Sequence, residues 1–308
     1  MYFPSDTALR EAFQLQPGAD CAALKHLRAA IQLSRLPGVG AKKFKAFVDL
    51  HGSPIEALKI VNQQVTLTDS AGKTALTCQQ LDELLNLPEA VGFTYYGAAD
   101  YPRQLAELSE PPPYLFYDGT LWPLPPMLVA IVGPRDCSDE GASFAQAIAA
   151  QLAAQGVVIV SGGAFGIDTA AHCGALEAGG FSILVTATGI DRVYPAANNK
   201  LFVQTRERGC ILTELLPGTP PRRDFFPTRN RIIVGLSYAV IIVEGKSRTG
   251  TWSSANHALR QQRQIFTWLK SPRSELRELP NLLIKRGAIP LNSVDSDPIM
   301  ALITRRQP

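Results

Sequence analysis

The pattern of hydrophobic residues divides the chain into two parts. In the first part, apolar residues recur at helical spacing, as in Leu24, Leu27 and Ile31. After the first part and a proline-rich stretch, short and almost wholly apolar runs alternate with longer stretches suited to helices. We therefore predict a small all-α module over residues 1–90 and a larger domain over residues 127–308.

The apolar runs of the larger domain predict a parallel sheet, because strands that are apolar on both faces occur where helices cover both sides of such a sheet. The predicted strands span residues 127–132, 157–160, 182–186, 210–213, 239–243 and 264–268. The predicted helices span residues 140–155, 168–178, 198–208, 229–236 and 253–262. This alternation predicts an extended Rossmann-like, doubly wound α/β domain with a mostly parallel sheet. A final helix around Leu282 and Leu283 should pack on the same core.

A proline-rich segment joins the two parts. Prolines neither continue a helix nor donate hydrogen bonds within a central strand, and six of them fall between residues 109 and 126: Pro111, Pro112, Pro113, Pro123, Pro125 and Pro126. We predict that residues 91–126 form a connecting segment packed on the core. The tail from Ser271 is too short for another domain, so no C-terminal winged helix is expected.

Composition narrows the range of functions. With 46% hydrophobic and 19% charged residues among 308, the chain is expected to fold, and a net charge of +3 means that nucleic-acid binding would require a local basic patch. The first residues, MYFPSDTALREAF, do not resemble a secretion signal, and no run approaches the roughly 20 apolar residues of a membrane span. We predict a cytoplasmic protein without membrane contact. The five cysteines form no CxxC pair, so neither a metal nor a disulfide framework is expected.

Loops at the predicted strand ends carry groups suited to phosphate. Ligands of doubly wound sheets bind at the carboxyl ends of strands, where helices begin with free N–H groups. Glycines and hydroxyl side chains in such loops are typical of an anion-binding nest, and no Gly-Lys-Ser/Thr follows that would make a P-loop. The candidate phosphate contacts are Arg135, Ser161, Gly162, Gly163, Gly166, Lys200, Gly250, Thr251 and Ser253.

The richest stretch lies between residues 220 and 231, where four arginines accompany two phenylalanines. Cations suit the backbone of a single strand, and aromatic faces suit its unpaired bases. A structural ion pair at Arg229 and a core position for Phe225 are the alternatives. We predict DNA contacts from Arg223, Phe226, Arg229, Asn230 and Arg231.

Two further motifs allow more than one interpretation. Asp168 and His172 share one face of a predicted helix and suit either an acid–base pair or capping and packing; we favour the structural roles because no nucleophile is evident nearby. Residues 36–44, LPGVGAKKF, have a helix-hairpin-helix pattern. Its N–H groups and lysines predict a secondary DNA contact, with packing or protein contact as the alternative. The residues of that contact are Gly38, Gly40, Lys42 and Lys43.

These motifs, taken in order, resemble the DprA/Smf family. The resemblance begins with a helix-hairpin-helix or sterile-alpha-motif-like module and continues through Asp100-Tyr101-Pro102, Ser161-Gly162 to His172, Phe226-Pro227 to Arg231, and Gly250-Thr251. It implies a non-catalytic homodimer, with no cofactor, that binds and protects single-stranded DNA without sequence preference. It also implies that the protein helps to load the RecA recombinase during natural transformation and recombination.

The chain departs from the family pattern at two positions. Pro134 replaces a usual serine or threonine, and Phe165 stands where many members have arginine, which removes one phosphate contact. A nucleotide-binding or nucleotide-hydrolysing Rossmann enzyme is the main alternative function. Related phosphoribohydrolases carry Pro-Gly-Gly-x-Gly-Thr followed by glutamate, whereas residues 248–251 read RTGT without such a glutamate. A protein-interaction adaptor with residual DNA affinity is the third possibility.

Overall fold

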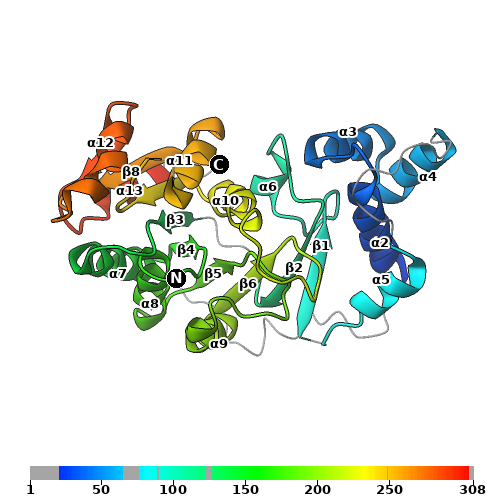
Figure 1. Cartoon of the computed structure of the whole chain (residues 1–308), viewed down its shortest axis with the longest axis horizontal. Helices are drawn as coiled ribbons and strands as arrows, with labels where there is room; N and C mark the ends of the chain where they lie inside the picture. The colour runs from blue at the N-terminus through cyan, green and yellow to red at the C-terminus, as the bar shows by residue number, and fades with distance from the viewer. Residues whose placement is uncertain (1–20, 65–75, 89, 122–126, 248, 305–308) are drawn as a thin grey trace.

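A single nine-stranded sheet organises the protein, shown by a computed structural model that describes residues 21–64, 76–88, 90–121, 127–247 and 249–304 (Figure 1). The first 20 residues, Pro123, Pro125, Pro126 and Arg248 lie outside the described residues.

The strand order is β1-β2-β6-β5-β4-β3-β7-β8-β9. The run from β6 to β9 is parallel throughout, while β1 and β2 are antiparallel. The bounds are β1 Val91–Tyr95, β2 Tyr114–Gly119, β3 Leu128–Val132, β4 Val158–Ser161, β5 Ser182–Val185, β6 Gly209–Thr213, β7 Ala239–Ile242, β8 Gln264–Trp268 and β9 Ile289–Leu291. The chain winds outward from β3 to β6 and then returns to the other side of β3 at β7. The predicted doubly wound fold is therefore confirmed, and the crevice of such a fold lies at this reversal.

Helices cover both faces of the sheet, which explains why its central strands are almost wholly apolar. In β3, Val129 and Ile131 belong to one hydrophobic cluster, whereas Leu128 and Val132 belong to the other. The first cluster includes side chains of α7 (Asp139–Ala154), α8 (Ile167–Glu177) and α13 (Asp297–Thr304). The second includes side chains of α9 (Asn199–Glu207), α10 (Phe225–Leu236), α11 (Gly250–Arg260) and α12 (Glu278–Ile284).

The helical module lies beside β1 at one end of the sheet (Figure 1). It contains α2 (Cys21–Arg35), α3 (Ala41–His51), α4 (Pro54–Gln64) and α5 (Cys78–Leu84). His26 stacks on Tyr95 with ring centroids 5.1 Å apart, and the Lys45 ammonium donates to the Tyr96 hydroxyl at 2.5 Å. These contacts pack the module directly against the sheet.

The segment predicted as a connection contributes two strands to the sheet. Residues 91–126 include β1, the short α6 (Arg103–Ala106) and β2, and β2 is an interior strand between β1 and β6. Pro111, Pro112 and Pro113 precede β2, so no N–H group is missing from its ladder. The tail likewise forms β9 and α13 in addition to the expected helix α12.

No helix within the described ranges is both long and apolar enough to cross a membrane. Cys137, Cys173 and Cys210 are free thiols. In the same part of the chain, no group of three or more histidine, cysteine or acidic residues could hold a metal ion.

Candidate nucleic-acid interface

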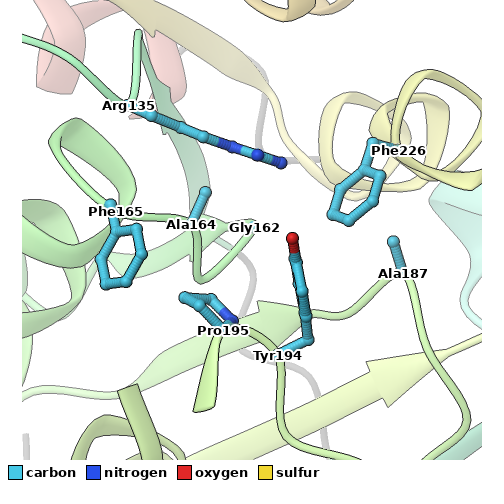
Figure 2. A pocket seen from close by; sticks show the side chains of 8 residues that line it. All are labelled: Arg135, Gly162, Ala164, Phe165, Ala187, Tyr194, Pro195 and Phe226. Atoms are coloured by element: carbon cyan, nitrogen blue, oxygen red, sulfur yellow. The ribbon is translucent and has the colours of Figure 1, made fainter. Parts of the chain in front are cut away.

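A pocket lies at the carboxyl ends of β3, β4 and β5. Its lining comes from the loops that follow β3, β4 and β5 and from the start of α10 (Figure 2). The lining residues are Arg135, Gly162, Ala164, Phe165, Ala187, Tyr194, Pro195 and Phe226. The predicted glycine loop, the predicted arginine and the predicted aromatic residue thus meet at one site.

The loop between β4 and α8 requires glycine at its last position. Gly166 has φ of 74° and precedes the first turn of α8. A Cβ atom there would lie 2.5 Å from the Pro134 carbonyl oxygen and 2.6 Å from that of Arg135. The absence of a side chain therefore lets the β4–α8 loop pack against the loop that carries Arg135.

Part of the predicted anion nest is used within the protein. The Asp168 carboxyl is buried and accepts hydrogen bonds from the backbone N–H groups of Ala164 and Gly162. Burial raises the pKa of Asp168, while the Arg229 guanidinium opposes that shift. Ser161 is fully buried and donates to the Ile131 carbonyl at 2.7 Å. Ser161 and the Gly162 N–H group therefore shape the loop from within, and their contact with DNA stays a prediction.

His172 has a structural role. Its imidazole is completely buried, and Nδ1 lies 2.7 Å from the Ser182 hydroxyl oxygen. Burial is the main cause that lowers its pKa to about 3, so the ring is neutral at physiological pH. A side chain that neither reaches the pocket surface nor exchanges protons near pH 7 is poorly suited to acid–base catalysis. Packing thus accounts for His172, and Asp168 holds the loop before α8 without capping that helix.

Three predicted DNA contacts at the start of α10 are buried ties between loops. Arg229 is 6% exposed and donates to the carbonyl oxygens of Gly162, at 2.7 Å, and Val185. Asn230 donates to the Gly250 carbonyl at 3.3 Å, and Arg231 pairs with Glu214. Since buried charges must be compensated internally, these side chains position the site. The sequence shows their charge but not this burial, and their direct contact with DNA stays a prediction.

The groups that remain accessible are cationic and aromatic. The exposed Arg135 guanidinium lies over the Phe226 ring, 5.0 Å from its centroid. The Phe226 ring in turn lies 5.6 Å from the Tyr194 ring. Arg223 is exposed, and within the described ranges neither Arg135 nor Arg223 forms an ion pair with an acidic side chain. Both cations are thus available to phosphates.

The sequence alone does not reveal a stacking role for two aromatic residues of the pocket, Phe165 and Tyr194. Phe165 lies within the glycine loop between β4 and α8, and Tyr194 precedes a proline, but neither position carries a signal that distinguishes an exposed ring from a core ring. The structure leaves them 46% and 36% exposed, respectively. They join Phe226 in making the pocket aromatic.

The other predicted contacts lie around the pocket. Gly250 is exposed at the start of α11, Thr251 is buried, and Ser253 donates to the Pro227 carbonyl at 3.4 Å. This bond holds the α11 terminus against the start of α10. Lys200 is exposed on α9, outside the pocket lining.

The hairpin of the helical module forms as the sequence predicts. Gly38 has φ of 74°, and Gly40 precedes α3 without a side-chain cap on the helix. Lys42 and Lys43 are exposed. None of the pocket-lining residues comes from α2 to α5, so any contact with DNA here would be separate from the pocket.

Comparisons with known proteins agree with this architecture. Protein Smf of Synechocystis is 41% identical over 179 residues, which is 56% of this chain and 44% of that protein. DNA processing protein DprA of Streptococcus pneumoniae is 39% identical over 211 residues, covering 68% of this chain and 74% of that protein. The matched stretch therefore spans less than half of the first relative and about three quarters of the second.

Two solved structures share the fold. The X-ray structure of DNA processing protein A from Streptococcus pneumoniae has a TM-score of 0.67 at 28% identity, covering 92% of this chain and 93% of that one. A Helicobacter pylori DNA processing protein A, studied for its single-stranded DNA binding mode, has a TM-score of 0.63 at 29% identity and covers 70% and 97%. The sequence profile of the family described as DNA recombination-mediator protein A matches residues 92–301. This chain belongs to the DNA recombination-mediator protein A family.

Proposed function

We propose that the protein binds single-stranded DNA in this pocket without sequence preference and without catalysis. The observation that carries the proposal is the Arg135 guanidinium over the half-buried Phe226 ring, in a pocket at the carboxyl ends of the parallel strands, where doubly wound sheets bind ligands. Arg135 and Arg223 supply cations for successive phosphates, and Phe226 supplies a face for a base. Any base can stack on the Phe226 ring, because every base has a flat aromatic face of its own.

A single strand fits these groups better than a duplex does. Bases in a duplex already stack on their neighbours and present only their edges in the grooves. Aromatic side chains that line a pocket can be used only by bases that have left the stack. The relative from Helicobacter pylori, which was studied for its single-stranded DNA binding mode, supports this choice.

A salt titration of binding to a fluorescent 20-nucleotide oligo-dT tests the proposal. The logarithm of the association constant should fall linearly with the logarithm of the salt concentration, and Arg223→Ala should reduce the slope by about 0.7, the contribution of one phosphate contact to a single strand. Phe226→Ala should cost about 1–3 kcal/mol of binding with little change in slope. Leu50→Ala, at a side chain 75% exposed on α3, is the control and should change neither quantity. Salt-independent binding, or none, would overturn the proposal.

The family membership supports two finer proposals, a homodimer and an action on the RecA recombinase. A mediator of recombination must deliver the strand to a recombinase, and RecA is the bacterial partner that the resemblance implies. Sedimentation at micromolar concentration should give twice the monomer mass of 33.4 kDa. The protein should also increase RecA loading on strands already covered by a single-strand-binding protein, as occurs in natural transformation. A monomer would overturn the first proposal, and unchanged RecA loading the second.

A further inference from the structure

The Phe165 side chain is not needed by the hydrophobic core. It is 46% exposed, belongs to neither core cluster, and makes no ring contact within the described part of the chain. Six large apolar side chains are strongly exposed in that part, and two of them, Phe165 and Tyr194, line this one pocket. Isolated exposed apolar residues are ordinary, but two on the same pocket indicate a surface that binds something flat and apolar.

The aromatic residues form two separate walls. Tyr194 and Phe226 lie on one side with Arg135 above Phe226, and Phe165 lies on the other side, beyond Ala164 (Figure 2). Because Ala164 lies between the two walls, each wall can offer an aromatic face to a different base.

We propose that Phe165 is a second stacking surface, which holds the base adjacent to the one on Phe226. The proposal rests on the proposed function of the pocket. In this arrangement the phosphate between the two bases lies near Arg135 and the turn that ends at Gly166. Because the phenyl ring carries no charge, Phe165 contributes affinity through the base and not through the phosphate.

A comparison of two ligands with equal charge separates base stacking by Phe165 from an effect on the phosphate contacts. One is a 20-nucleotide oligo-dT, and the other is a 20-unit strand of abasic tetrahydrofuran residues with the same phosphates. Phe165→Ala should weaken binding of oligo-dT about 5- to 150-fold, the equivalent of one stacked base. It should leave both the affinity for the abasic strand and the salt slope for oligo-dT unchanged. Because Phe165 is exposed and outside the core, the variant should fold, and Leu50→Ala is the matched control for loss of an exposed apolar side chain.

A double variant tests whether the walls hold different bases. If Phe165 and Phe226 act on separate bases, the fold losses of Phe165→Ala and Phe226→Ala should multiply. A double variant no weaker than one single variant would mean that both rings hold the same base, and would overturn the inference. Equal losses of Phe165→Ala on oligo-dT and on the abasic strand would also overturn it.

The test distinguishes this inference from the proposed function. If the wild type binds oligo-dT and Phe226→Ala weakens binding while Phe165→Ala does not, only the second stacking surface is refuted. If the wild type binds neither strand, both proposals fail.

Discussion

Replacing Arg229 with alanine should destabilise the fold by about 3–5 kcal/mol. The guanidinium donates to the Gly162 carbonyl at 2.7 Å, to the Val185 carbonyl, and to Asn230 Oδ1 at 3.2 Å, and its charge opposes the rise that burial causes in the pKa of the Asp168 carboxyl. Each buried acceptor left without a donor costs about 1–3 kcal/mol, and removal of one partner from a buried charge pair typically costs about 3–5 kcal/mol. The two costs are not additive, because relaxation of the surrounding structure and protonation of Asp168 reduce each of them. We therefore expect a loss of about 3–5 kcal/mol, the larger of the two, and not their sum.

Urea unfolding followed by tryptophan fluorescence measures this loss directly. Arg223→Ala is the matched control, since that arginine is exposed and unpaired with acidic side chains; its unfolding free energy should stay within about 0.5 kcal/mol of wild type. The deficit of Arg229→Ala should shrink as pH falls, because the unpaired Asp168 carboxyl can then be protonated in the folded state. A loss below about 1 kcal/mol at pH 7 would refute the role of Arg229 as a buried tie.

Three further predictions concern pH, backbone and the hairpin. His172 has a folded pKa of about 3, below its unfolded value, so the unfolded chain binds the proton first and stability falls as pH drops below about 6.5. Relative to His172→Asn, wild type should lose about 1.4 kcal/mol per pH unit in urea unfolding between pH 6 and 4, and parallel profiles would contradict this. Gly166→Ala should destabilise the protein more than Gly179→Ala. Both glycines have φ of 74°, but only at Gly166 would a Cβ atom collide with a neighbouring backbone. Equal losses of stability in thermal unfolding would refute the close approach of the Gly166 loop to the Arg135 loop. The double variant Lys42→Ala/Lys43→Ala should reduce the salt slope of oligo-dT binding by about 1.4 if the hairpin contacts two phosphates, and an unchanged slope would restrict the hairpin to packing or protein contact.

The sequence predicts the central sheet well because its strands are buried on both faces. All six predicted strands form, with ends within one residue of the predicted ones. The first two strands were missed for physical reasons. β1 is mostly half-buried and only five residues long, and β2 follows three prolines that conceal its beginning.

The sequence predicts which residues lie at the site but not which of their side chains are exposed. The strand-end rule brings Arg135 and the glycine loop together correctly, and the local pattern identifies Phe226. An arginine that reaches phosphate and an arginine that ties two loops have the same local sequence signal. Burial of Arg229 depends on Gly162 and Val185, which are distant in sequence. The sequence therefore does not distinguish the exposed arginines from the buried ones.

Photocrosslinking tests the central claim most directly. A 20-nucleotide oligo-dT in which 5-iododeoxyuridine replaces single thymidines reacts with aromatic side chains against which the base stacks. After irradiation and digestion, mass spectrometry should identify adducts at Phe226 and at the other exposed rings of the pocket, Tyr194 and Phe165. Phe226→Ala should remove the first of these adducts. Crosslinks confined to α2 to α5, or to any surface outside the pocket, would contradict the assignment of this site to single-stranded DNA.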